Sequence, residues 1–359
     1  APFSGISIQR FGPQGYFYVD GGYIQSFGPV SNANPDLKWE QKKGFNVGVD
    51  FEALDMRLTG SVEYYRSITD DLLFEVPVPV PPNLYPTTWK NVGQLNNQGI
   101  EASLGFLAIQ QEDVSWNTSL TFSTFETILK EYISDEVQYT ANAGSPGLNS
   151  TNLIRIKEGE PIGQIWGPEF AGFSDDGKWL LYNAAGDKVT PDAITNEDKK
   201  VLGDGLPDFQ LGWSNTFTYK SFDLDIFLRG VFGHDMVNTY KLFYQPPNQI
   251  TSYNVLQSAF DITELTTSPQ FSSFQVEDAS FVRLQNATLG YNVPIAENRL
   301  VRDLRIYLSA NNLFTITGYD GIDPEVNYVD GDNPLAPGIE RRNSWYTARS
   351  FTLGINIDF

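Results

Sequence analysis

The chain contains 359 residues, and its composition excludes several classes of protein. It has no cysteine, which rules out disulfide frameworks and cysteine-based metal sites. Its formal net charge of −20 argues against nucleic acid as a partner, because phosphate binding needs a basic patch. No stretch approaches the ~20 apolar residues of a membrane helix, yet an aromatic fraction of 14% is typical of a membrane β-barrel with aromatic girdles.

Apolar and polar residues alternate with a period of two along much of the chain, which is the pattern of a strand with one apolar face. The alternation changes phase near Phe281–Tyr291, which predicts a β-bulge. About eleven segments carry the pattern, strongly or weakly, and they begin near residues 43, 56, 100, 114, 152, 162, 209, 222, 281, 304 and 351. Their opposite faces carry Asn, Asp, Glu, Arg, Ser and Thr, as a water-filled lumen requires.

The connections between these segments alternate strictly between short and long. The short ones lie near Ala53–Asp55, Ala108–Asp113, Glu158–Pro161, Lys220–Ser221 and Asn292–Arg302. The long ones are Ile68–Gln98, Glu126–Thr151, Ser174–Pro207, Gly233–Asp278 and Thr315–Thr347. Outer-membrane barrels have short periplasmic turns and long extracellular loops, whereas a soluble β-sandwich has no reason to sort loop length in this way. We therefore predict an all-β, antiparallel transmembrane β-barrel.

The alternation of short and long connections also predicts on which side of the membrane the two ends of the chain lie. The first strand, near Lys43–Phe51, and the last strand should both run from the outside towards the periplasm. A single-chain bacterial barrel has an even number of strands, so an odd count predicts further strands upstream. We expect residues 1–40 to belong to an extracellular loop, and residues 41–359 to form the C-terminal half of a barrel.

The C-terminal strand ends on an aromatic residue. It alternates apolar with polar residues, and the apolar positions are Phe351, Leu353, Ile355, Ile357 and Phe359. This ending resembles the signal that the barrel-assembly machinery reads, since an exposed edge strand pairs readily with another sheet edge. The alternative is an ordinary C-terminal edge strand.

Several ordered motifs resemble the SusC-type, also called RagA-type, TonB-dependent transporters of Bacteroidetes. The motifs occupy residues 34–40, 45–51, 60–73, 91–101, 159–163, 203–209, 281–291, 311–315 and 321–326. Among them are Asn34-Pro35-Asp36-Leu37-Lys38-Trp39-Glu40 and Gly321-Ile322-Asp323-Pro324-Glu325-Val326. Each is weak alone, but they follow one another in order from about residue 34 to the end.

The resemblance implies an outer-membrane barrel of about 22 strands, of which this chain would supply about 11. It also implies a plug and a TonB box in an N-terminal part, and a SusD-like surface lipoprotein that captures oligosaccharides or peptides. The expected partners are this lipoprotein, TonB, the N-terminal half of the barrel and outer-membrane lipid. A passive porin or structural barrel, and a soluble carbohydrate-binding module, are the alternatives.

The sequence does not point to an enzyme. A Ser-His-Asp triad would need His234, the single histidine, and we expect it to be a solvated loop residue. No cofactor is predicted. Four aspartates next to turn residues are weak candidates for calcium ligands, and plain turns are the favoured explanation: Asp175, Asp176, Asp330 and Asp332.

Substrate contacts would come from aromatic side chains in the long loops. Such rings stack on sugar faces, although girdle or packing roles are the alternative for each one. The candidates are Trp179, Tyr240, Tyr244, Trp345 and Tyr346.

Overall fold

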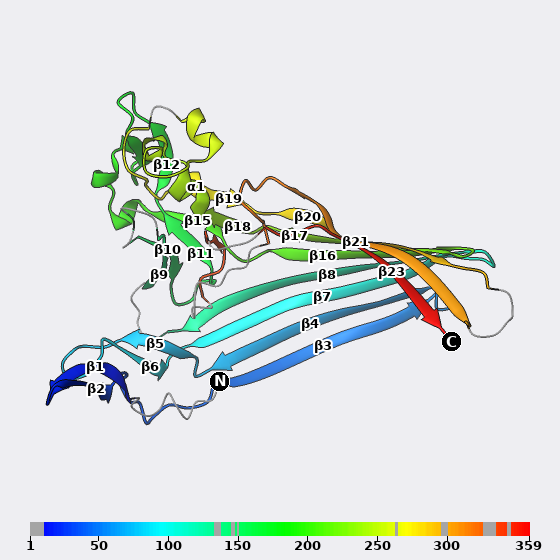
Figure 1. The fold of residues 1–359 in the computed structure, drawn as a ribbon, viewed down its shortest axis with the longest axis horizontal. Coiled ribbons are helices and arrows are strands. Elements are labelled where there is room, and N and C mark those ends of the chain that lie inside the picture. Colours follow the sequence, from blue (N-terminus) through cyan, green and yellow to red (C-terminus); the bar gives the residue numbers. More distant parts are fainter. Residues whose placement is uncertain are drawn as a thin grey trace.

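The fold is dominated by one long antiparallel sheet of nine strands (Figure 1). The computed structural model describes residues 11–132, 138–144, 148, 151–262, 265–295, 301–325, 335–342 and 346–359. The sheet consists of β3 (Gln41–Ala53), β4 (Leu58–Asp70), β7 (Gln94–Gln110), β8 (Val114–Glu131), β16 (Phe209–Tyr219), β17 (Phe222–Phe232), β20 (Phe281–Asn292), β21 (Asp303–Thr317) and β23 (Ser350–Asp358). Each strand pairs with the next one in this list, so the sheet is a meander with β3 and β23 at its edges.

The two faces of this sheet differ in chemistry, as the alternation predicts. One row of directly paired residues is apolar across six strands: Trp116, Phe217, Leu224, Leu289, Leu308 and Leu353. The neighbouring row, one residue along each strand, is polar: Asn117, Thr216, Asp225, Thr288, Ser309 and Thr352. Leu353 is 74% exposed. The apolar side chains therefore form an outward belt rather than a core, as in a wall that faces lipid.

The strand count is nine in the long sheet, and the expectation of about eleven was too high. The segments near residues 152 and 162 are instead short strands among the loop elements, where β10 has five residues and β11 four. Strands of this length do not cross a bilayer, which needs about 9–11 residues. They carry aliphatic residues because they lie in a buried core. The alternation of short and long connections survives this correction, because both strands fall inside a single long connection between β8 and β16.

The bulge predicted near Phe281–Tyr291 is confirmed. The register of β20 shifts between Leu284 and Asn286 against β21, and its pairing with β17 shifts between Phe227 and Leu228.

The long connections fold into small sheets at one end of the long strands (Figure 1). A four-stranded sheet contains β15 (Lys200–Asp204), β11 (Gln164–Gly167), β10 (Asn152–Ile156) and β9 (Gln138–Asn142). Two three-stranded sheets contain β12 (Glu169–Phe173), β13 (Trp179–Tyr182) and β14 (Lys188–Val189), and β19 (Val276–Asp278), β18 (Asp235–Asn238) and β22 (Ile339–Glu340). Helical turns complete this region: α1 (Thr239–Tyr244), η2 (Pro191–Ala193), η3 (Asn196–Asp198), η4 (Pro247–Gln249), η5 (Gln257–Asp261) and η6 (Ser273–Gln275). We call this region the cap.

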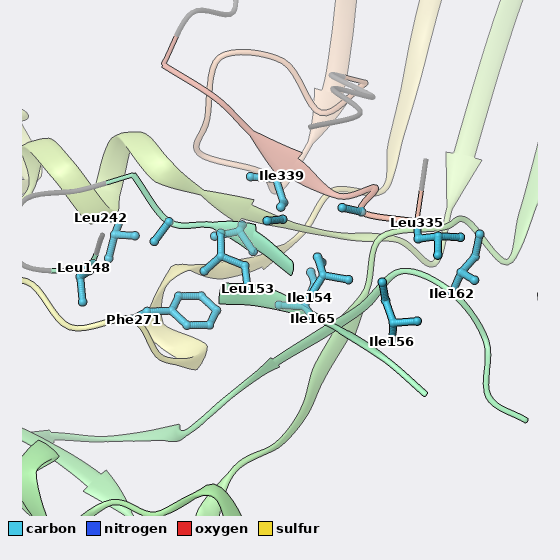
Figure 2. Close-up of a cluster of buried hydrophobic side chains, with 14 of the residues drawn as sticks. Leu148, Leu153, Ile154, Ile156, Ile162, Ile165, Leu242, Phe271, Leu335 and Ile339 are labelled. Atoms are coloured by element: carbon cyan, nitrogen blue, oxygen red, sulfur yellow. The ribbon is translucent and has the colours of Figure 1, made fainter. Parts of the chain in front are cut away.

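The cap has the hydrophobic core that the long sheet lacks (Figure 2). Leu153, Ile154 and Ile165 from β10 and β11 are fully buried there. They pack with Phe271 from the connection between β17 and β20 and with Ile339 from the connection between β21 and β23. Three connections that are distant in sequence thus close one core. No helix in the described part of the chain is long and apolar enough to cross a membrane.

Two further hairpins lie at the same end of the long strands as the cap: β1 (Phe11–Val19) with β2 (Gly22–Pro29), and β5 (Leu73–Pro77) with β6 (Thr87–Asn91) (Figure 1). Asparagine side chains join them. The Asn32 Nδ2 donates to the backbone oxygen of Thr87 at 2.8 Å, and the Asn34 Nδ2 donates to that of Trp89 at 2.8 Å. The two asparagines are spaced by two residues, as are the carbonyls that they bind. The motif that begins at Asn34 therefore fixes the approach to the first long strand.

The assignment of the two faces predicts unequal effects of charge at neighbouring positions of β21. Leu308→Arg should reduce the amount of folded, heat-modifiable protein in outer membranes, because an arginine at the lipid face costs about 2–4 kcal/mol at mid-membrane depth. Ser309→Arg, the matched control, points to the polar face and should be tolerated. Equal losses for the two variants would contradict the assignment.

Candidate transport wall and loop sites

Polar side chains bind one another across the strands on the inner face of the sheet. The Thr288 and Ser309 hydroxyls are 2.8 Å apart, and the Asn286 Nδ2 donates to the Asn311 Oδ1 at 2.9 Å. The Thr216 hydroxyl donates to Asp225 at 2.7 Å. This face offers short hydroxyl, amide and carboxylate groups to water or a passing solute. It is therefore chemically suited to line a hydrated passage.

A group of charged side chains joins this face to the last long connection near the cap end of the strands. Arg283 on β20 pairs with Asp323 at 2.6 Å and with Glu325 at 2.5 Å. Arg229 on β17 also pairs with Glu325. The Arg283 and Asp323 side chains are each 6% exposed, so water screens this pair little. We call these four residues the charge clamp, because they hold the segment after β21 against the wall.

A buried carboxylate fixes the same segment from the cap side. Glu340 on β22 accepts hydrogen bonds from the Tyr319 hydroxyl at 2.7 Å and from the Ile322 backbone N–H at 2.8 Å. It also accepts from the Asp323 backbone N–H at 3.2 Å. Burial raises the pKa of Glu340, although these donors oppose the shift, and burial beside Glu340 raises the pKa of Tyr319. The described part of that motif, residues 321–325, is thus held by Glu340 from the cap side and by the charge clamp from the wall.

His234 does not lie in solvent, so that expectation was wrong. The side chain is 4% exposed, its Nε2 lies 3.0 Å from the Pro324 backbone oxygen, and its ring packs edge-on against Phe281. The charge clamp holds the segment that carries Pro324 against the long sheet, and this segment covers the imidazole. Its Nδ1 has no hydrogen-bond partner among the described residues, and the contacts of the ring are those of a packed side chain.

The structure brings three of the predicted contact residues into one region. Tyr240 and Tyr244 lie on α1 with their ring centroids 6.1 Å apart, and Tyr346, which is 77% exposed, lies close to Tyr240. Phe243 and Tyr253 stack beside them at 4.9 Å, and the Arg342 guanidinium lies 4.3 Å from the centre of the Phe243 ring. Sequence reasoning did not identify Tyr253 or Arg342. We call these six residues the tyrosine cluster.

Trp179 is not part of that cluster. It is 2% exposed and packs between Phe170, Phe173 and Phe274, with its Nε1 donating to the Ser268 backbone oxygen at 3.1 Å. Neither face of this indole is open to a sugar, so the structure gives Trp179 a packing role instead. Trp345 lies outside the described residues.

Neither calcium candidate gains support. The Asp176 carboxylate is 2.5 Å from the Lys178 ammonium and accepts from the Ser174 hydroxyl at 2.6 Å, as in a tight turn. Asp330 and Asp332 lie outside the described residues. The described residues contain no group of three or more metal-ligating side chains.

The C-terminal residues occupy one edge of the long sheet. Phe351, Leu353, Ile355 and Ile357 lie on the outward face of β23, and Phe359 follows it. The inner face is tightly fitted: a side chain at Gly354 would lie 2.2 Å from the Tyr307 ring. The role of this strand in assembly stays a prediction.

A one-layer antiparallel wall with an apolar outer face, a polar inner face and long connections gathered at one end defines an outer-membrane β-barrel wall. The chain belongs to the TonB-dependent receptor family: the family model described as "TonB dependent receptor-like, beta-barrel" matches residues 8–313. The chain is therefore part of an outer-membrane β-barrel of this family, whose members are TonB-dependent transporters and not enzymes.

Individual relatives agree with this assignment. The chain is 32% identical to TonB-dependent receptor P3 of Formosa agariphila over 354 residues, which is 91% of this chain and 35% of that protein. It is 29% identical to TonB-dependent receptor SusC of Bacteroides thetaiotaomicron, covering 91% of this chain and 32% of that protein. The solved structure of the RagAB peptide importer in its closed-closed state aligns with a TM-score of 0.81 at 25% identity, covering 99% of this chain and 39% of that one. The chain thus spans about a third of the length of the curated relatives that it matches.

The charge clamp predicts a non-additive pair of substitutions. Arg283→Ala leaves the Asp323 carboxylate buried without its main partner, and should destabilise the cap end by about 3–5 kcal/mol. Arg283→Ala combined with Asp323→Ala leaves no orphaned charge at that pair and should recover part of the loss. Proteolysis of surface loops on whole cells measures the effect. A double variant as sensitive as the sum of the single variants would contradict the coupling.

Two half-buried aspartates in the cap, Asp204 and Asp235, predict a pH dependence. Burial, with the nearby Asp208, raises the pKa of Asp204 and of Asp235, and the Asp204 backbone N–H donates to Asp235 at 3.1 Å. The folded state therefore holds protons more tightly than the unfolded state, and cap stability should fall as the pH rises through the folded-state pKa. Asp235→Asn removes the free-energy cost of ionising a half-buried carboxyl. The variant should therefore slow loop proteolysis at pH 7 and have little effect at pH 4. Asp175→Asn, in an exposed turn, should change neither rate, and an Asp235→Asn gain that is equal at both pH values would contradict the argument.

Proposed function

We propose that this chain forms part of the wall and the extracellular cap of a TonB-dependent importer that moves oligosaccharides or peptides across the outer membrane. The proposal rests on the connection after β21, which is fixed at the cap end of the polar face, the mouth of the proposed passage. The charge clamp and Glu340 hold a long connection against the polar face, where a solute would enter. A structural barrel would have no need for a connection fixed to its inner wall by buried ion pairs.

The substrate class follows from relatives and from the loop chemistry together. One structural neighbour is a peptide importer, and one curated relative is SusC. The tyrosine cluster presents aromatic faces and phenol groups, which stack on sugar rings and equally on peptide side chains. Arg342 adds a guanidinium at the edge of these rings. We therefore assign the tyrosine cluster as a first contact for an oligosaccharide or a peptide.

The partners are part of the same proposal. Energy coupling requires TonB and a plug, which we place in the part of the relatives' length that this chain does not span. A SusD-like surface lipoprotein would cover the mouth, and the cap is the folded surface on which it would sit. Barrel closure requires strands that pair with the open edges of β3 and β23, since unpaired backbone groups are not tolerated in lipid.

Uptake of labelled oligosaccharides and peptides by cells that express the whole transporter tests the assignment. Tyr240→Ala combined with Tyr244→Ala should reduce uptake at low substrate concentration severalfold, because stacking contacts are lost, while the level of folded protein is unchanged. Tyr219→Ala is the matched control, since this exposed tyrosine lies at the other end of the strands.

A proton uncoupler separates active import from a passive pore. It should abolish uptake through the importer, whereas uptake that continues in its presence would identify a passive porin. Unchanged uptake by the double tyrosine variant would remove the tyrosine cluster from the substrate path.

A further inference from the structure

A cavity lies in the cap, and its lining residues belong neither to the tyrosine cluster nor to the polar face of the long sheet. It measures about 330 Å³, within the range of small-molecule sites. Its walls come from β11, β13, η2 and η3 and from the connection that carries Phe271. The residues that decide its chemistry are Trp166, Leu181, Pro191, Asn196, Lys199 and Phe271.

The apolar walls are firmly held. Leu181 and Phe271 are buried, and Phe271 belongs to the cap core. The Arg155 guanidinium lies 4.2 Å from the centre of the Trp166 ring and fixes that indole in place. The Trp166 Nε1 is enclosed and has no acceptor among the described residues. Because this N–H has no accessible surface, Trp166 contributes the apolar surface of its ring to the cavity.

The cavity has a positive polar end. Among its described lining residues Lys199 is the only charged one, and its Nζ is positioned by the Asn196 Oδ1 at 2.9 Å. Two acidic side chains that adjoin lining residues in sequence, Asp198 and Glu169, are bound by other groups. Asp198 accepts from the backbone N–H groups of Thr195 and Ala184, which lower its pKa, and Glu169 pairs with Lys200 at 2.6 Å.

We propose that this cavity binds a small ligand that carries a carboxylate on a compact apolar body. The carboxylate would pair with Lys199 Nζ, and the apolar body would lie against Trp166, Phe271 and Leu181. A negatively charged group is attracted by the Lys199 ammonium, whereas a positively charged ligand would be repelled by it. The C-terminal residue of a peptide and a uronic acid unit of a glycan share this chemistry. The site adds a recognition step in the cap to the proposed import function.

Binding to the whole transporter, purified in detergent, tests the proposal without any transport step. Two pairs of probes each compare a carboxylate with a neutral group on the same body: N-acetyl-L-phenylalanine against its amide, and D-glucuronate against D-glucose. Ligand-observed NMR or calorimetry gives the affinities. At least one acid should bind roughly tenfold or more tightly than its neutral partner, as expected for a charge-assisted hydrogen bond. The pair that shows the preference identifies the source as peptide or glycan.

Substitutions then locate the binding. Lys199→Gln should abolish the preference for the acid, whereas Lys200→Gln, the adjacent lysine that pairs with Glu169 outside the cavity, should retain it. Trp166→Leu removes the aromatic wall of the cavity and should weaken binding of the acid severalfold, which provides a second test if Lys199→Gln folds poorly. Equal binding of acid and neutral probe, equal behaviour of the two lysine variants, or no binding of either acid would overturn the proposal. Failed uptake with intact acid binding would instead overturn the import function alone.

Discussion

Every backbone N–H and C=O inside a bilayer must find a partner within the protein, and this requirement governs the rest of the structure. Seven of the nine long strands meet it by pairing on both sides, whereas β3 and β23 at the edges of the sheet are each paired on one side. Once the pairing is fixed, side chains have only two directions in which to point. A single row of leucines and aromatics therefore faces lipid, and the row beside it carries threonine, serine and asparagine. Alternate residues of the same strands therefore form the lipid-facing surface and the polar surface.

The requirement disappears beyond the membrane, and the architecture changes there. The cap folds as a water-soluble domain does, with short strands, turns and a closed aliphatic core. The long sheet and the cap meet at the charge clamp, where arginines of the sheet bind carboxylates of the connection after β21. Such pairs tolerate little displacement, because a buried charge without its partner is expensive. The charge clamp therefore fixes where this connection lies against the wall.

The sequence predicted the wall better than the cap, for a physical reason. A membrane strand must alternate over many residues, and Leu304–Ala310 or Phe351–Phe359 show this without any knowledge of contacts. Loop parity then gave the direction of each strand. The four- and five-residue strands β10 and β11 were misplaced because short aliphatic runs look alike in a wall and in a core.

The loop sites were predicted unevenly. Tyr240, Tyr244 and Tyr346 were recognisable as loop aromatics, but nothing in the sequence distinguished them from Trp179, whose burial depends on Phe170 and Phe274 over a hundred residues apart. The clamp residues had a weak signal. Arg283 interrupts an apolar strand at the phase change, and Asp323 and Glu325 stood out only as part of a family motif. Their pairing is a long-range contact that periodicity does not encode.

The placement of β22 has a consequence for the order in which the molecule forms. This strand pairs in parallel with β18, and Leu335, Ala336 and Ile339 complete a core otherwise built from residues 129–271. Its sequence lies only about ten residues before the final strand. Contacts of such high sequence separation close late, since the loop entropy is paid before any contact is gained. The cap therefore cannot reach its finished state on a nascent or truncated chain, and its maturation is tied to arrival of the C-terminus.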